Sequence, residues 1–143
     1  MIVIHPNIIV GSVYDLTANF NNIHYILNCS ISLNNLLFHP NYINLNISIF
    51  NQNSIQLLNS IFEFIYGNIE LKYNIFILCE TGINNSLIIG MFIIMKLYKL
   101  KYNDVYNSIV KNNIINSYYY YSGLIFYEQY ILDKNNIDDM DIF

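Results

Sequence analysis

The sequence predicts an α/β fold in which a central, mostly parallel twisted sheet is flanked by helices. Short apolar segments bounded by Pro, Gly and Asn indicate strands in the first half of the chain. A segment with apolar residues at helical spacing follows, then an apolar strand and a second helix that is apolar almost all round. At 143 residues the chain is long enough for one domain with its own core.

Three short strands are expected at residues 2–4, 8–10 and 25–27, with one or two helical turns over residues 15–20. Residues 42–49 alternate apolar and polar side chains, which is typical of a half-buried strand. The helix after it has apolar residues at 55, 58, 61, 62 and 65. Asn53 or Ser54 is expected to cap this helix, and Gly67 to end it.

Residues Ile75–Leu78 are apolar on both faces, which favours a central strand over an edge strand. Cys79 ends this strand, a polar turn with Gly82 follows, and residues 87–97 predict a buried helix. A strand, a short glycine-containing loop and a helix aim backbone N–H groups at an anion. We therefore expect a phosphate-sized site between this strand and this helix.

The last third of the chain predicts a short helix from a cap at Asn103 to Lys111, and an amphipathic helix over residues 122–132. Residues 1–134 are expected to form the domain. Residues 135–143 are expected to form a solvated acidic tail, since Asp138, Asp139 and Asp141 lie there.

Composition excludes several classes of function. All six basic residues are lysines and the net charge is -4, so nucleic acid is not an expected partner. Three dispersed histidines, His5, His24 and His39, do not have metal-ligand spacing, and no cofactor is expected. Residues 86–95 form the longest apolar run, which is shorter than the roughly 20 residues that span a bilayer.

Two cysteines and no signal-peptide pattern predict a reducing, cytoplasmic location without a disulfide. Cys29 is expected in the core.

A resemblance to a known family rests on residues 79–86: Cys79, Glu80, Thr81, Gly82, Ile83, Asn84, Asn85 and Ser86. This segment resembles the signature loop of dual-specificity, cysteine-dependent protein phosphatases, which reads His-Cys, five residues, Arg, then Ser or Thr. Residues 8–30 resemble the family's opening, a strand ending in Gly-Ser, a short helix, and a strand closing on Leu-Asn-Cys-Ser. Further resemblance at residues 42–49, 62–65, 111–116 and 126–129 extends it, in order, over roughly residues 8 to 132.

The resemblance implies a phosphatase-like fold, but three catalytic groups of the family are missing. Leu78 stands where the family has histidine, and Asn85 stands at the position of the arginine that clamps phosphate. The family's general acid would fall near residues 49–51, yet no Asp or Glu occurs from Leu16 through Phe62. Cys79 would then be a vestigial nucleophile. Glu80 adds a negative charge beside it.

Two retained side chains have a structural interpretation beside the catalytic one. A small, soft side chain suits the end of a buried strand, and we favour this explanation for the presence of Cys79. Ser86 would assist departure of the thiolate in an active enzyme or cap the following helix, and we favour the cap. Gly82 serves the backbone shape of the loop in either case.

Three functions stay open at this point. The leading hypothesis is an inactive pseudophosphatase that acts through protein contacts in phospho-signalling, with a phosphoprotein or a second copy as partner. The high apolar content and the tyrosine run at residues 118–121 favour a homodimer. The alternatives are phosphate binding without turnover and a weak cysteine-dependent phosphatase. The excess of Asn, Ile and Tyr is compatible with an AT-rich viral genome and hence with a host-cytoplasmic protein.

Overall fold

The computed structural model describes residues 2–16, 22–29, 41–45, 55–79, 85–110 and 128. Its five-stranded sheet has the order β1-β2-β5-β3-β4, in which β1 is antiparallel to β2 and the other neighbours are parallel. The mostly parallel sheet is therefore confirmed. The strands are β1 (Ile2–His5), β2 (Ile8–Gly11), β3 (Tyr25–Asn28), β4 (Tyr42–Asn44) and β5 (Ile75–Leu78).

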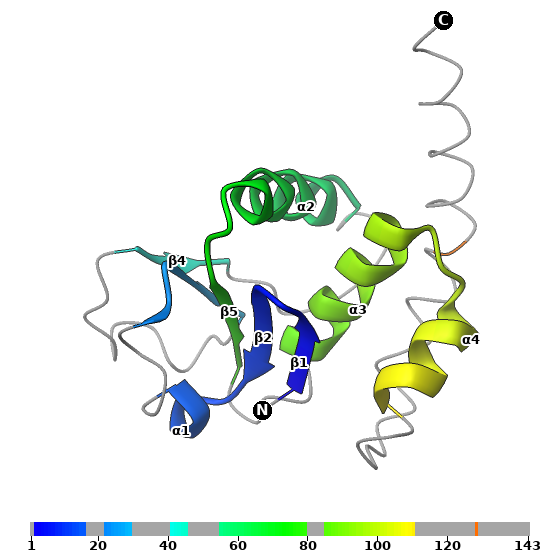
Figure 1. Ribbon diagram of the computed structural model, residues 1–143, viewed down its shortest axis with the longest axis horizontal. Coiled ribbons are helices and arrows are strands. Elements are labelled where there is room, and N and C mark those ends of the chain that lie inside the picture. Colours follow the sequence, from blue (N-terminus) through cyan, green and yellow to red (C-terminus); the bar gives the residue numbers. More distant parts are fainter. Residues whose placement is uncertain are drawn as a thin grey trace, which may run out of the picture.

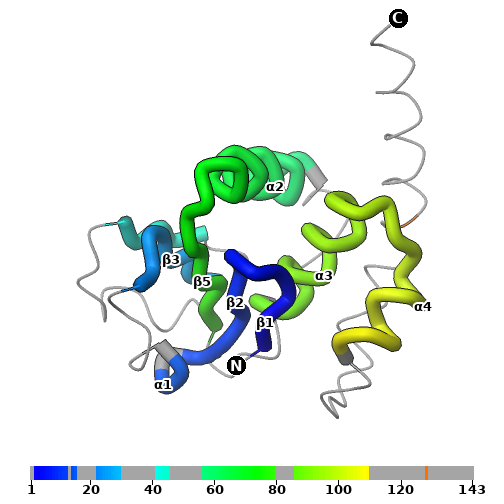
Figure 2. The backbone as a smooth tube through the Cα atoms, viewed as in Figure 1, coloured from blue at the N-terminus to red at the C-terminus, as the bar shows by residue number. Residues whose placement is uncertain are grey.

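The central position of β5 agrees with its sequence. All four of its residues are buried, as expected for a strand covered on both faces. It lies between β2 and β3, which come from the first quarter of the chain (Figure 2). The arrows of β2 and β5 point to the same edge of the sheet, close to α1 (Val13–Leu16) and the start of α3 (Asn85–Tyr98) (Figure 1).

One face of the sheet carries the larger part of the core. Leu27, Ile75 and Ile77 pack there with side chains of α2 (Ile55–Glu70) and α3. The predicted buried helix is α3, whose residues are all buried from Ser86 to Met95. A Cβ at Gly90 would lie 2.8 Å from Ile4 Cδ1 and 2.9 Å from Val10 Cγ2, so glycine lets α3 approach β1 and β2 closely.

The opposite face carries a smaller cluster. Ile23, Ile26, Phe76 and Leu78 pack together there, so side chains alternate between the faces along β3 and β5. Beyond α3, the short helix α4 (Tyr102–Val105) continues into a π-helical turn, η3 (Tyr106–Val110). The buried residues of α4 and η3, Tyr102, Val105 and Ile109, belong to the larger cluster. No helix among the described residues is long and apolar enough to cross a membrane.

The prediction that Gly67 ends its helix is wrong, because α2 continues to Glu70. An interior glycine costs about 1 kcal/mol relative to alanine, but Ile69 packs against the core beyond it and holds the last turn in place. Lys72, at φ 60°, makes the turn instead. Lys72 N donates to Ile69 O (2.8 Å) and Tyr73 N to Asn68 O (3.0 Å), which is the Schellman pattern of helix ends.

Other boundaries also differ from the sequence-based expectation. The N-cap of α4 is Lys101 rather than Asn103, because Val105 N already donates to Lys101 O (3.2 Å) and the helix therefore begins before Asn103. Tyr102 N donates to Glu128 Oε1 (2.8 Å). The short helix expected from Asp15 begins earlier, at Val13, where Ser12 caps it. Within residues 42–45, strand geometry covers only β4. The expected caps at Asn53 and Ser54, residues 111–127 and the tail at 135–143 lie outside the described residues.

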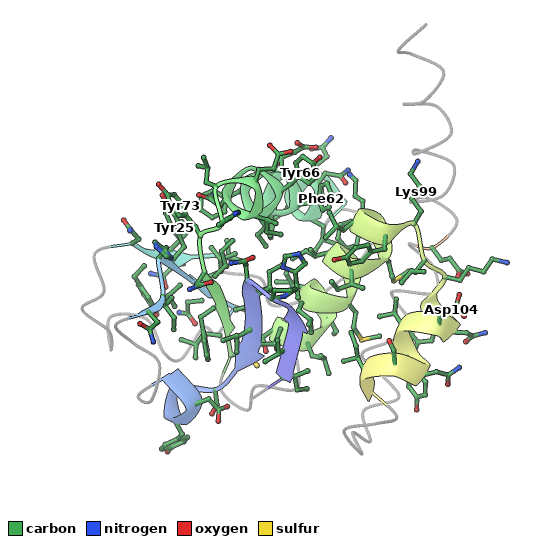
Figure 3. The ribbon with its side chains drawn as sticks, in the orientation of Figure 1. Tyr25, Phe62, Tyr66, Tyr73, Lys99 and Asp104 are labelled. Atoms are coloured by element: carbon green, nitrogen blue, oxygen red, sulfur yellow. The ribbon has the colours of Figure 1, made fainter. Side chains whose placement is uncertain are left out.

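Aromatic side chains gather where the parallel strands begin, at the edge opposite Cys79. Tyr25 and Tyr73 lie side by side there (Figure 3), with ring centroids 6.2 Å apart. Tyr73 also stacks on His24 at 4.7 Å, and Phe64 of α2 meets Tyr25 edge-on at 5.1 Å. These ring contacts pack the beginnings of β3 and β5 against α2. The candidate site lies at the opposite edge of the sheet, where these strands end.

Candidate functional site

Cys79 lies directly after β5, at the carboxyl edge of the sheet. Its backbone N donates to Gly11 O at the end of β2 (3.2 Å), so the sheet pairing continues to this residue. The side chain is only 3% exposed and belongs to the core face of the sheet. In open α/β sheets, ligands bind beyond the carboxyl ends of the strands, and Cys79 occupies such a position.

Ser86 is a polar partner of the Cys79 thiol. Its Oγ lies 2.9 Å from Cys79 Sγ, and Ser86 is completely buried. The preference for Ser86 as a helix cap is wrong, because α3 begins at Asn85 and Ser86 already lies within its first turn. Its hydroxyl faces the thiol instead, so it is placed to stabilise a thiolate there.

Helix α3 directs its N-terminus toward the same edge. It has 14 residues, no acidic residue in its first turn and one lysine in its last. A helix of this length places partial positive charge at its start, which favours an anion there. The loop residues Glu80, Thr81, Gly82, Ile83 and Asn84 lie outside the described residues, as does the side chain of Asn85.

The lysines that the structure describes lie away from Cys79. Lys72 precedes β5, at the opposite end of that strand. Lys96 lies ten residues after Ser86 on α3, about 15 Å along the helix axis. Its Nζ donates to Asn59 Oδ1 (2.7 Å) and lies 4.7 Å from the centre of the Phe62 ring. Lys99, which is labelled in Figure 3, and Lys101 lie beyond this end of α3.

Asp15 is a carboxylate at the edge where β2 ends, and no motif in the sequence points to it as a site residue. Ser12 N and Ser12 Oγ both donate to Asp15 Oδ2, at 2.9 and 3.2 Å. The hydrogen bond from the Ser12 backbone is the main cause that lowers the pKa of Asp15. A carboxylate held in its ionised form is a poor proton donor, so Asp15 serves the start of α1 rather than acid catalysis.

Cys29 is the second thiol at this edge. It is 1% exposed, which confirms its expected place in the core, and it follows β3 as Cys79 follows β5. Burial, and then the nearby Cys79, raise the pKa of the Cys29 thiol well above its ordinary value. Both cysteines are free thiols.

Other site chemistry is limited in the described part of the chain. No group of three or more His, Cys, Asp or Glu residues there is arranged to hold a metal ion. A cavity of about 200 Å³ lies between α2 and the β3–β4 end of the sheet. The surface of this cavity is nearly all hydrocarbon, so the cavity does not suit a phosphate. The residues that line it are Leu27, Ile43, Leu45, Leu57, Ser60, Ile61 and Phe64.

Comparison with known proteins gives a match in structure but not in sequence. No protein-family model matches the chain, and no curated protein matches it. A leucine-rich-repeat and phosphatase-domain protein from Entamoeba histolytica has a TM-score of 0.71 at 20% identity, covering 97% of this chain and 93% of that one.

Two further solved structures are similar over nearly the whole chain. DUSP15 has a TM-score of 0.72 at 19% identity, with 92% of each chain covered. The human tyrosine phosphatase-like serine/threonine/tyrosine-interacting protein has a TM-score of 0.67 at 18% identity, covering 98% of this chain and 97% of that one. The chain therefore has the fold of the dual-specificity phosphatases, as the sequence predicted.

Proposed function

We propose that this chain is a pseudophosphatase of the dual-specificity family, which keeps the phosphatase scaffold without its turnover. The observation that carries the proposal is the composition of the site: Cys79 and Ser86 are in contact at the end of β5, while Asn85 occupies the arginine position between loop and helix. The chain has no arginine anywhere to replace it.

The missing groups have large energetic consequences. An asparagine amide cannot provide the charged, planar fork with which arginine holds two phosphate oxygens. Removal of one preorganised donor to a developing oxyanion costs about 10²–10³ in rate, and absence of a general acid costs roughly 10²–10⁴. Asp15 does not supply the acid, because its hydrogen bonds to Ser12 favour the ionised form. Little phosphatase activity of the family's type is expected to remain.

A scaffold of this kind acts through binding, and we infer a regulatory role through a protein partner in phospho-signalling. One solved structure of similar fold is described as a tyrosine phosphatase-like, serine/threonine/tyrosine-interacting protein, which supports an interaction role as a precedent. A second copy of the chain is one candidate partner, since the chain is 55% hydrophobic and large apolar side chains such as Val3, Leu71 and Tyr98 are exposed. Light scattering over a concentration series tests this, and a monomer throughout would exclude the homodimer.

The deciding experiment measures hydrolysis of an aryl phosphate and of phosphotyrosine and phosphothreonine peptides. Wild type and Cys79→Ser are compared under identical conditions. We expect equal, background rates from both proteins. Turnover that disappears in Cys79→Ser would refute the pseudophosphatase and establish instead a weak cysteine-dependent phosphatase.

Phosphate binding without turnover is the second candidate, and the placement of α3 favours it. The helix starts six residues after Cys79, and its N-terminus favours an anion at this edge. Inorganic phosphate binding by calorimetry, on wild type and Asn85→Arg, tests this role. We expect weak binding in wild type and at least tenfold tighter binding in Asn85→Arg, because a bidentate charged clamp is restored. No measurable phosphate binding by either protein would exclude the phosphate site.

A further inference from the structure

The cavity between α2 and the β3–β4 end of the sheet is built by residues of three elements. Leu27 of β3 and Ile61 of α2 form its floor, and these side chains are 1% and 5% exposed. Ile43 of β4 and Phe64 of α2 are half-buried and form its walls. Leu57, which is 40% exposed, lies at its mouth. The cavity therefore leads from the surface of α2 down to the core layer between this helix and the sheet.

This cavity offers little to hold water. A buried water needs about two to four polar partners. Of the lining residues, all of which the structure describes, Ser60 alone has a polar side chain, and its Oγ already donates to Gln56 O (3.0 Å). The backbone of Leu45 is paired within the sheet, because Leu45 N donates to Asn28 O (2.9 Å). An apolar occupant would therefore not have to displace well-bound water.

The volume and chemistry of the cavity define the class of molecule that fits it. The cavity measures about 200 Å³, and an engineered apolar cavity of about 150 Å³ in another protein binds benzene. Sites for drug-sized ligands measure about 300–1,000 Å³, so this cavity suits a single ring with small substituents. The lining residues carry no charge, so a charged ligand would lose its hydration there without gaining a partner.

Phe64 favours an aromatic ring over an alkyl chain as the occupant. Two aromatic rings that stack with an offset or meet edge-on gain more than the burial of their area alone provides. The ring of Phe64 is already held by Tyr25, which it meets at a centroid distance of 5.1 Å and an angle of 88°. A wall that is fixed before binding loses little freedom when the ligand arrives.

We propose that this cavity is a binding site for a small, uncharged aromatic molecule of one ring, of the toluene class. The ring enters beside Leu57, contacts Phe64 and packs against the floor at Leu27 and Ile61. Bound there, it ties β4, an edge strand of three residues, to α2. None of the lining residues belongs to the loop after β5, so this proposal stands or falls separately from the proposed function.

A titration of the full-length wild-type protein with toluene tests the site, with ¹³C-labelled methyl groups of Ile and Leu followed by NMR. We expect saturable shifts, with one dissociation constant, at the methyl groups of Leu27, Ile43 and Ile61. The methyl groups of Leu71, which is 63% exposed and does not line the cavity, should not shift. No shift up to the solubility limit of toluene, or equal shifts at Leu71, would overturn the proposal.

Benzoate is the matched control ligand, because it has the same ring with a carboxylate in place of the methyl group. It should cause no shift at Leu27 or Ile61, since its charge would be buried without a partner. Toluene at about ten times its dissociation constant should raise the thermal midpoint by about 3–6 °C, and benzoate should not. Benzoate that shifts the same methyl groups as strongly as toluene would contradict the assigned ligand class.

Ile43→Phe places a ring inside the cavity and should abolish the saturable shift that toluene causes at Leu27. Val3→Phe is the matched control, because it also places a phenylalanine on a strand, but at an exposed position outside the cavity. It should bind toluene as wild type does. Undiminished binding by Ile43→Phe would refute the site. The wild-type titration needs no substitution, so it decides the proposal even if a variant fails to fold.

Discussion

Replacement of Ser86 by alanine tests whether its hydroxyl stabilises a thiolate on Cys79. The Ser86 hydroxyl is buried and lies 2.9 Å from Cys79 Sγ. Donation from this hydroxyl to a Cys79 thiolate would contribute about 1.5–3 kcal/mol, the range for hydrogen bonds to charged groups. Since 1.4 kcal/mol corresponds to a factor of ten, the thiolate fraction at a fixed neutral pH should fall about 10- to 100-fold. We therefore expect Ser86→Ala to slow alkylation of Cys79 by iodoacetamide by that factor.

Ser60→Ala is the matched control for this experiment. Ser60 is an exposed helix serine whose Oγ donates to Gln56 O within α2. Its removal should leave the alkylation rate of Cys79 unchanged. Rates that are equal in Ser86→Ala and wild type would refute the electrostatic role of Ser86 and restore a purely structural one. Peptide mapping identifies Cys79 as the labelled residue in each case.

Three further predictions concern stability. Lys72→Gly should raise the unfolding free energy by about 0.5–1 kcal/mol, because φ 60° costs a side-chain-bearing residue about 1–2 kcal/mol that glycine avoids, less its own entropic cost; an unchanged thermal midpoint would contradict this. Gly90→Ala should lower the unfolding free energy, because a Cβ 2.8 Å from Ile4 Cδ1 and 2.9 Å from Val10 Cγ2 costs about 1–3 kcal/mol in overpacking, against about 1 kcal/mol gained in helix propensity. A higher urea midpoint in Gly90→Ala would refute this close approach of α3 to the sheet. Burial lowers the pKa of His5 below its ordinary value of 6.5, so folding favours the neutral imidazole. The contribution of His5 to stability should be complete above pH 6.5 and should be lost as the pH falls through the lowered pKa. His5→Gln should reduce this loss, which urea unfolding at neutral and mildly acidic pH will measure.

The sequence predicted the main strands and the buried helix because their signals are local. The uniform apolar character of Ile75–Leu78 requires cover on both faces, and α3 is apolar almost all round. The helix continues past Gly67 because the packing of Ile69 against the core outweighs the low helix propensity of glycine. No rule of local sequence selects Lys72 over a glycine for the left-handed turn.

The candidate site was only partly predictable, for a similar reason. Cys79 and Ser86 could be identified from the loop pattern, but their contact depends on where α3 begins, and the sequence did not determine that residue. The neighbourhood of Cys29 depends on strand order, which brings together residues that are 50 positions apart. No sequence motif marks Asp15, and only the pairing of β2 with β5 brings it to the same edge of the sheet as Cys79.

The insertion of β5 between β2 and β3 also determines how the chain reaches its native state. Until residues 75–78 are in place, β1 with β2 and β3 with β4 are two separate pairs, each with an unpaired inner edge. During synthesis the first 74 residues therefore expose two strand edges, at β2 and β3, whose backbone N–H and C=O groups have no partner strand. Such non-local pairing slows folding and leaves nascent chains open to aggregation. The strand that leads into Cys79 is thus also the strand that joins the two halves of the sheet.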